Sequence, residues 1–409
     1  LQQAGLVDIK ARRAANARRA QLEARQSTDS DALVEAFLSG FEDLVEEDAA
    51  SIAPVESGDK RVPPAVRQLG RNDDHVASVP RFWDQAGVLY RDGAQDRLTA
   101  DPYLATGSMP PLSATFNDMS GLRAKMPAFD PTLCTGCSKC WTSCPDSAIG
   151  VVAAGPAALI DAGIARTGAE AVRQVAGKLA GRIISANRKA DEPAATFGPM
   201  LEEAGAWLLE KAPLPDDRKQ AIKEGIGQIV EAFGGLPVAV TEPFFHGPEA
   251  QQKDSAELLS IVVNPDACKA CGSCVAACEP RALQSSPQDE ERLAAERAMW
   301  EMFSATPDTP GKSVERAAEH PDVGPTAAMM LSRYCQFALA GGDAAEAGSG
   351  EKIAVRLALA ATEYHQQPIA QRFANKLEEA GAEVATLVRN TLSGTLPVED
   401  LDAVSEQLE

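Results

Sequence analysis

The order of apolar and polar residues predicts helices near the N-terminus, followed by a long irregular stretch. Four apolar residues in the N-terminal region recur every three or four positions: Leu33, Phe37, Phe41 and Leu44. This spacing places them on one side of a helix, and Ser and Thr residues just before them are suitable caps. We therefore expect residues 1–50 to be helical. Residues 51–125 are rich in Pro, Asp and Gly and show no sustained period, which predicts an extended connector with little regular structure.

Two further apolar stripes of helical period lie between residues 152 and 250. They consist of Val172, Val175, Leu179 and Ile183, and of Ile222, Ile226, Ile229 and Phe233. The breaks DEPAATFGP and APLPDD punctuate these helices, so a small bundle of three or four helices is predicted. The chain from 291 to 409 is again mainly helical in pattern, with breaks at GGDAAEAGSG and at Pro368.

Composition narrows the range of functions. The chain has 409 residues, enough for two or three domains, and 44% hydrophobic residues, enough for buried cores. Its net charge of −20 argues against nucleic acid or an anionic membrane as a partner, because both are polyanions. The longest uncharged stretch near the first cysteines, residues 147–160, is too short for a membrane span. The basic segment 10–25 is interpreted as an exposed helix, within a longer parent chain or at the start of a processed subunit.

Eight of the nine cysteines lie in two similar stretches. FDPTLCTGCSKCWTSCPDSAI spans residues 129–149, and VNPDACKACGSCVAACEPRAL spans residues 263–283. The two align without a gap, and each contains C-x2-C-x2-C-x3-C, the spacing found in bacterial ferredoxins with two [4Fe-4S] clusters. Gly136 and Gly272 permit a close approach of the backbone to a cluster. The stretches differ after the last cysteine, where Glu279 displaces the proline by one position in the second copy.

The repetition has a chemical explanation in the ligation of two clusters. In two-cluster ferredoxins, the fourth cysteine of each stretch ligates the other cluster, so each copy completes the ligand set of its partner. The predicted sets are Cys134, Cys137, Cys140 with Cys278, and Cys268, Cys271, Cys274 with Cys144. The segment between the two copies then only has to leave and return at one edge of this module.

Structural zinc is the competing interpretation of the eight cysteines. Zinc sites usually combine two C-x2-C pairs around one ion, and do not place three ligands and an offset fourth in each half. Thiols kept in metal-binding register indicate a reducing compartment, and we expect the cytoplasm. Cys335 is interpreted as a buried apolar residue. Lys139 and Lys269, within the cysteine loops, are expected to be solvated, or else to raise a cluster potential or dock an acidic carrier.

The sequence upstream of the first cysteines resembles a known family. DPYLATGSMPPLSATFNDMSGLRAKMPAF, residues 101–129, is similar to the segment that leads into the two-cluster domain of pyruvate:ferredoxin (flavodoxin) oxidoreductases, with Ala105 and Ser108 replacing a proline and a threonine. The resemblance covers roughly residues 95–150 and 258–285. It implies a parent enzyme that oxidatively decarboxylates a 2-oxoacid on thiamine diphosphate with Mg²⁺. Electrons would leave through two [4Fe-4S] clusters to ferredoxin or flavodoxin.

The C-terminal part departs from this family. A loop for a further cluster near the thiamine would be expected downstream, but AEAGSGE, residues 345–351, has Glu346 and Ser349 in place of two thiols. The thiamine signature is also missing. We therefore expect thiamine diphosphate and Mg²⁺ only in the remaining domains or subunits of the parent enzyme, and no catalysis by this chain alone. The loop itself can also be a flexible linker, and the alternative function is a ferredoxin-like electron-wiring adaptor of another redox complex.

These patterns together predict an α+β protein. A bacterial two-cluster ferredoxin-like module is interrupted by a helical insertion and flanked by mainly helical N- and C-terminal segments. The expected parts are a helical segment at 1–50, a connector at 51–125, the ferredoxin-like domain at 126–151 and 251–290, the insertion at 152–250, and the C-terminal segment at 291–409.

Overall fold

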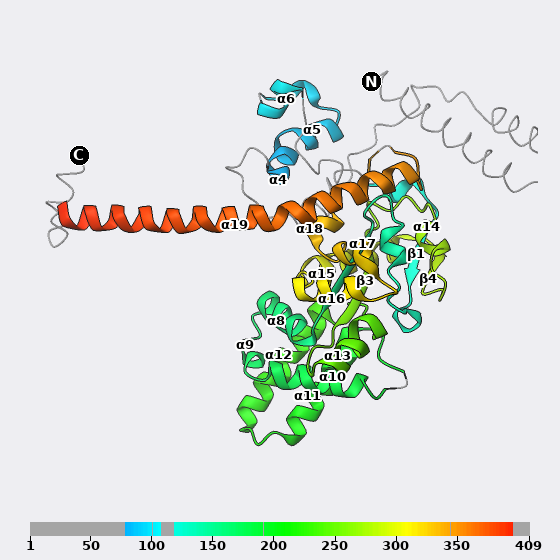
Figure 1. Cartoon of the computed structure of the whole chain (residues 1–409), viewed down its shortest axis with the longest axis vertical. Coiled ribbons are helices and arrows are strands. Elements are labelled where there is room, and N and C mark those ends of the chain that lie inside the picture. The colour runs from blue at the N-terminus through cyan, green and yellow to red at the C-terminus, as the bar shows by residue number, and fades with distance from the viewer. Residues whose placement is uncertain (1–77, 100, 108–117, 191, 344, 396–409) are drawn as a thin grey trace, which may run out of the picture. The chain divides into compact units, whose positions relative to one another are not determined.

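The computed structural model describes residues 78–99, 101–107, 118–190, 192–343 and 345–395 (Figure 1). All of them belong to one of the two compact units into which the chain divides, Val62–Glu409. The helices predicted at 1–50, and much of the predicted connector, lie outside the described residues. Within the described part of the chain, no helix combines the length and the apolar content needed to cross a membrane.

The described part of the predicted connector is more helical than its Pro, Asp and Gly content indicated. Its elements are α4 (Val79–Phe82), the π-helical turn η2 (Trp83–Gly87), α5 (Val88–Arg91), η3 (Gln95–Arg97), α6 (Pro102–Thr106) and η5 (Ser120–Leu122). Phe82, Trp83 and Ala86 are buried at helical spacing, and this burial outweighs the weak local propensity. Asp101 caps the start of α6 and forms a 2.6 Å ion pair with Arg81.

Two antiparallel strand pairs frame the cysteine stretches. They are β1 (Lys125–Phe129) with β4 (Leu283–Pro287), and β2 (Ile149–Ala154) with β3 (Leu258–Val263). The short helices between them are η6 (Pro131–Leu133), α7 (Lys139–Thr142) and α14 (Ser273–Ala276). Phe129 faces Leu283, and the equivalent residues of the repeat, Val263 and Ile149, face each other as well. Each cysteine stretch therefore runs from one strand pair to the other, and the two halves repeat the same arrangement.

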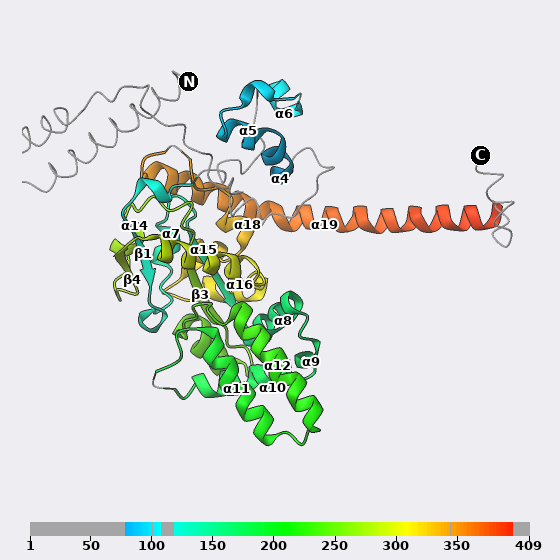
Figure 2. The same ribbon diagram turned by 180° about the vertical axis from the view of Figure 1, so that it is seen from behind.

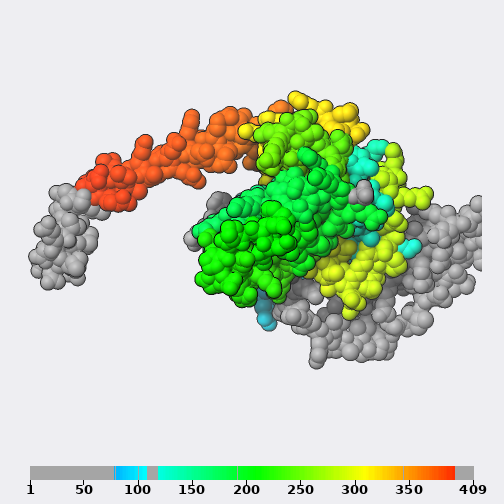
Figure 3. Space-filling model, turned by 90° about the horizontal axis from the view of Figure 1, so that it is seen from below, coloured from blue at the N-terminus to red at the C-terminus, as the bar shows by residue number. Residues whose placement is uncertain are grey.

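The insertion connects β2 to β3 as a long excursion from one hairpin. Its ends, Ala154 and Leu258, are partners in the strand register, so the chain leaves and returns at one place. Its helices are α8 (Pro156–Thr167), α9 (Glu170–Arg173), α10 (Ala176–Asn187), α11 (Phe197–Lys211), α12 (Asp216–Phe233), η7 (Glu242–His246) and α13 (Gly247–Gln251). Helices α8, α10, α11 and α12 contact one another (Figure 2) and form a continuous surface, green in Figure 3. The predicted helical character of this segment is confirmed.

The insertion and the central hairpin share a core. Val152 and Val262 of the hairpin belong to the same buried cluster as the bundle side chains, together with Trp300 and Phe303. These two aromatic residues leave no space for a side chain at Gly150, where a Cβ would lie 2.6 Å from the Trp300 ring. The bundle therefore rests on the strands that bracket the cysteine stretches.

The C-terminal segment is helical, as predicted. It contains α15 (Glu290–Ser304), α16 (Gly311–Glu319), α17 (Gly324–Met329), α18 (Arg333–Gln336) and α19 (Gly350–Thr395). The first turns of α19 are buried at Arg356 and Ala360, whereas Phe373 farther along is 63% exposed. The predicted break at Pro368 is wrong, because α19 continues through it. A proline removes one backbone hydrogen bond, and the good helix formers that follow it tolerate that loss. The α+β fold class is confirmed.

Candidate functional site

The two cysteine loops share a backbone conformation that glycine alone does not explain. Positive φ angles occur at Gly136 (76°) and Ser138 (66°) in the first loop, and at the equivalent Ala270 (51°) and Gly272 (80°) in the second. Each loop therefore has one glycine and one other residue in the left-handed region, in opposite order. Two such residues curl the chain tightly, which directs successive thiols to the same side.

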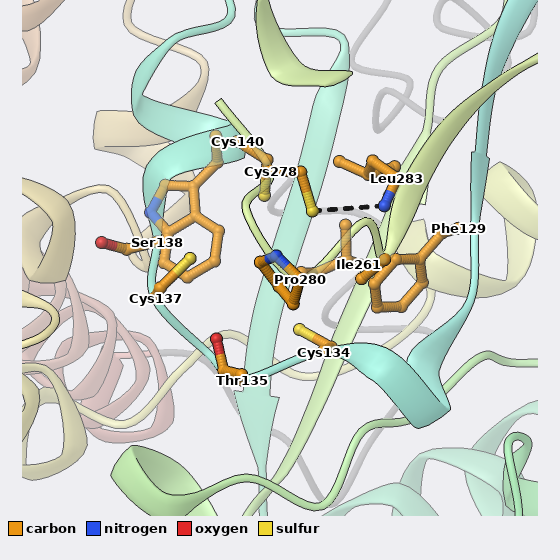
Figure 4. A pocket seen from close by; sticks show the side chains of 12 residues that line it. Phe129, Cys134, Thr135, Cys137, Ser138, Cys140, Ile261, Cys278, Pro280 and Leu283 are labelled. Atoms are coloured by element: carbon orange, nitrogen blue, oxygen red, sulfur yellow. Dashed lines mark hydrogen bonds between the residues drawn. The ribbon is translucent and has the colours of Figure 1, made fainter. Parts of the chain in front are cut away.

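The first site comprises Cys134, Cys137, Cys140 and Cys278. These side chains line a cavity with about 310 Å³ of empty space, part of it open to solvent, and Figure 4 shows the four thiols around it. Most of the remaining lining is apolar and includes Phe129, Trp141, Ile261, Pro280 and Leu283. The Leu283 amide donates a hydrogen bond to Cys278 Sγ at 3.3 Å. The structure thus brings the fourth cysteine of the second stretch to the first loop.

The second site comprises Cys144, Cys268, Cys271 and Cys274. Burial raises the pKa of Cys274, and charge on Cys144, Cys268 and Cys271 raises it further. Burial likewise raises the pKa of Cys268 to about 11, with Cys144 and Cys271 adding to the effect. Asp146, two residues after Cys144, pairs with Lys269 of the second loop at 3.1 Å, so Cys144 lies beside that loop. The exchange of the fourth ligand between two clusters stays a prediction.

Crowding of the buried thiols makes both sites receptive to cations. Burial raises the pKa of Cys140 well above its ordinary value, and charge on Cys134 and Cys274 raises it further. Thiols in this situation become thiolates when a metal binds, because the metal supplies the missing positive charge. The two sites adjoin at the equivalent residues Cys140 and Cys274, because the helices that carry them, α7 and α14, contact each other.

The arrangement of the cysteines in the sequence favours a cluster over a single ion. Each stretch supplies three thiols at three-residue steps and an offset fourth, which is the ligand pattern of bacterial [4Fe-4S] sites. Structural zinc sites usually combine two C-x2-C pairs around one ion. The cysteines fit two [4Fe-4S] clusters, one for each set of four.

The second site is flanked by a network of buried charges. Lys269 pairs with Asp146 at 3.1 Å and with Asp343 at 2.8 Å, and Lys352 pairs with the same two carboxylates at 2.5 and 2.7 Å. Burial raises the pKa of Asp343, but hydrogen bonds from the two lysines outweigh burial and lower it to about 2. The Lys269 side chain is only 8% exposed. The expectation that it is solvated is therefore wrong, because two carboxylates hold it inside.

The segment before α19 packs on the second loop. A Cβ at Gly341 would lie 2.0 Å from a backbone oxygen of the first cysteine stretch, and one at Gly348 (φ 79°) would lie 3.3 Å from Cys271 Cβ. Ser349 Oγ accepts a hydrogen bond from the Lys352 amide at 3.2 Å, in the first turn of α19. These contacts contradict the interpretation of this segment as a flexible linker. Ser349, at a position where the resembling family has a thiol, is a structural residue here.

The first site has a different environment. Lys139 and Glu279 form an ion pair on its surface, with side chains 49% and 79% exposed. Thr241 and Phe244, near the end of the insertion, pack behind Gly136, where a Cβ would lie 3.0 Å from Thr241 Oγ1. The first site is therefore backed by neutral side chains.

Sequence analysis did not identify the most deeply buried charge near the cysteines. Arg356 is 0% exposed, and its guanidinium donates to Ser147 Oγ at 2.9 Å and to the Trp141 carbonyl at 2.8 Å. These acceptors lie three residues after and three residues before Cys144, so the arginine holds both sides of the turn around that cysteine. Its sequence signal is a lone arginine in the apolar run IAVRLALAA, which gives no indication of a partner.

Comparison with protein families agrees with this geometry. The family model of the 4Fe-4S binding domain matches the chain twice, at residues 127–150 and 261–284. No curated protein matches the chain. The two matched segments contain the two cysteine loops and the adjoining ends of the strands on either side of them. The chain therefore carries a two-cluster, ferredoxin-like module for iron–sulfur electron transfer.

Proposed function

We propose that the chain is the electron-transfer portion of a 2-oxoacid:ferredoxin (flavodoxin) oxidoreductase, conducting electrons one at a time to an external carrier. The observation that carries this proposal is the grouping of Cys134, Cys137, Cys140 and Cys278 around one cavity, next to the second cysteine loop, whose helix α14 contacts α7. A [4Fe-4S] cluster bound in each set would accept and release a single electron. Adjacent sites would allow an electron to pass within one rigid module.

The chain's own residues would hold and shield the clusters. Backbone amides just after the equivalent residues Cys144 and Cys278, those of Ala148 and Leu283, donate to their sulfur atoms at 3.3 Å in both cases. Such hydrogen bonds stabilise negative charge on sulfur. Trp141, which is 1% exposed, excludes water from the wall of the first site.

Support for the 2-oxoacid assignment comes from the segment ahead of the first loop. The stretch DPYLATG, residues 101–107, forms a defined capped turn: Asp101 accepts a hydrogen bond from the Tyr103 amide at 2.9 Å, and Gly107 ends α6 with a φ of 67°. The segment that resembles pyruvate:ferredoxin oxidoreductases therefore forms a short helix, α6, with a cap at each end. Thiamine diphosphate and Mg²⁺ would belong to other domains or subunits, and this chain alone would not be catalytic.

A second candidate is a ferredoxin-like adaptor that wires another redox enzyme. The observation that favours it is the role of Ser349 and Gly348, which cap α19 and pack on Cys271 where the resembling family places a further cluster loop. In this case the donor would be an enzyme of different chemistry, and the two-cluster module would keep the same role.

The experiment that tests the proposal starts with anaerobic purification of the chain. We expect about eight irons and eight acid-labile sulfides per chain, and rapid transfer of electrons from the reduced protein to a flavodoxin, followed by its semiquinone absorbance. Stoichiometric zinc without sulfide would overturn both candidates. The complex isolated from its source cells then separates them, because only a 2-oxoacid oxidoreductase would reduce the clusters on addition of a 2-oxoacid and coenzyme A.

A further inference from the structure

The charges near the second site nearly all occur in balanced groups. Lys269 and Lys352 are matched by Asp146 and Asp343, and each lysine touches both carboxylates. Two cations and two anions leave this group without net charge. Its field at the cysteines is therefore that of a compact quadrupole, which falls off quickly with distance.

A second group on the same site is balanced in the same way. Arg297 pairs with Asp118 at 2.9 Å and with Asp266 at 2.7 Å. Arg123 donates to the Cys268 carbonyl at 2.6 Å, and the same two carboxylates act on it electrostatically. Two arginines and two aspartates again give no net charge.

Arg356 is the exception. Its hydrogen-bond acceptors are Ser147 Oγ, the Trp141 carbonyl and, at 3.4 Å, the Gln336 carbonyl, all of which are neutral. In the described part of the chain, no carboxylate forms an ion pair with it, and the nearby Asp146 is already shared between two lysines. The second site therefore has one positive charge in excess, in full burial.

A fully buried arginine with neutral partners is costly unless a negative group lies nearby. The nearest candidate is the cluster ligand Cys144, because the two groups that Arg356 holds, Ser147 Oγ and the Trp141 carbonyl, lie three residues on either side of it. A cluster held by four thiolates carries net negative charge, which increases on reduction. The arginine would therefore be stabilised by the loaded site, and it would stabilise the reduced state more than the oxidised one.

Among the residues that the structure describes, the first site has no counterpart of Arg356. Its charged neighbours, Lys139 and Glu279, are exposed and cancel each other, and solvent screens them. The position equivalent to Asp146 in the repeat is Pro280, which lines the apolar cavity. Amides donate to sulfur at both sites: Leu283 to Cys278 at 3.3 Å in the first, and Ala148 to Cys144 at 3.3 Å and Ala270 to Cys268 at 3.4 Å in the second, so these bonds do not offset the difference in charge.

We infer that the two clusters are unequal, that the second site holds the one of higher reduction potential, and that Arg356 is the residue that sets this difference. The inference rests on the proposed electron-transfer function. A singly reduced protein would carry its electron on the cluster at the second site, held by Cys144, Cys268, Cys271 and Cys274. The cluster at the first site would have the lower potential and would donate electrons to the second. Arg356 acts on the cluster through its charge and through the turn around Cys144, without ligating iron.

The test is a redox titration of the intact protein, monitored by electron paramagnetic resonance, in the Arg356→Gln and Arg356→Lys variants. In Arg356→Gln, the higher of the two midpoint potentials should move to a more negative value, while the lower one stays in place. Arg356→Lys keeps the positive charge, so the higher potential should stay close to its value in the unaltered protein. A purely structural role of Arg356 would not give this result. Lys139→Gln is the matched control at the first site, where loss of an exposed charge should move neither potential appreciably.

Asp343→Asn provides an independent measurement if Arg356→Gln does not fold. Asp343 is 35% exposed, so its replacement is tolerated more easily, and it leaves the two lysines with one carboxylate. The higher potential should then move to a more positive value. Movement of the lower potential in either variant, or no movement in folded protein with full iron content, would overturn the inference. Absence of iron and sulfide in the unaltered protein would instead refute the proposed function itself.

Discussion

The two cysteine sites are copies in sequence and in backbone, but they have acquired different surroundings. The first site is lined by apolar side chains and backed by Thr241 and Phe244 from the insertion. The second is covered by the segment before α19 and by the buried charges around Asp146 and Arg356. The insertion and the C-terminal segment are not part of the repeat. The comparison shows that repetition sets the ligand geometry, and that unrepeated segments set the environment of each copy.

The largest effect is expected when cysteine ligands are removed in pairs. If the sets are crossed, the double variant Cys134→Ala with Cys278→Ala loses one cluster and keeps the other, because both residues belong to the first site. The variant Cys134→Ala with Cys144→Ala should damage both clusters. Mössbauer spectroscopy of iron-labelled protein counts the intact four-iron clusters. The opposite pattern, with two clusters damaged in the first variant and one in the second, would show that ligation is not crossed.

The next largest effect concerns the charge network at the second site. Asp146→Asn leaves Lys269 and Lys352 buried with Asp343 as the one remaining carboxylate of this network. Removing one partner from a buried ion pair leaves an uncompensated charge, so we expect the free energy of unfolding to fall by about 3 kcal/mol. Anaerobic denaturant unfolding measures this change.

The matched control for this network is Glu279→Gln at the first site. Glu279 pairs with Lys139 on the surface, where solvent screens both charges. The unfolding midpoint should stay where it is. Equal destabilisation by Asp146→Asn and Glu279→Gln would remove the electrostatic distinction between the sites.

A smaller effect is expected from the backing of the first loop. In Gly136→Ala, the new Cβ would lie 3.0 Å from Thr241 Oγ1 in a left-handed conformation, so stability should fall by about 2 kcal/mol. Gly272→Ala has a similar φ of 80° but no atom within 4 Å, and should cost about 1 kcal/mol, from the backbone alone. Equal losses in the two variants, measured by denaturant unfolding, would show that the insertion does not constrain the first loop.

The smallest expected effect is a gain. Ala270 occupies, with a φ of 51°, the loop position that is glycine in the first copy. Ala270→Gly relieves the left-handed strain but makes the unfolded chain more flexible, so the net gain should be about 0.5 kcal/mol. An increase in the denaturant midpoint, with iron content unchanged, checks this value. A loss of stability would indicate that the Ala270 methyl group contributes packing that outweighs its backbone strain.

The sequence by itself determined the features that depend on local spacing. C-x2-C-x2-C-x3-C, written twice, indicated two four-iron sites and the exchange of the fourth ligand between them. The helical stripes of the insertion, including Ile229 and Phe233, are buried in its core as their period requires. Such signals are readable because ligand spacing and helical period are properties of short segments.

Only the tertiary structure decided which environment each cysteine site received. Asp146, Lys269 and Arg356 are ordinary charged residues in the sequence, and more than a hundred positions separate Asp146 from Lys269. They become the buried charges of the second site when the first turns of α19 pack beside Cys144. Burial is what makes their charges strong, because water no longer screens them. No local pattern encodes that docking, since it depends on residues brought together from distant parts of the chain.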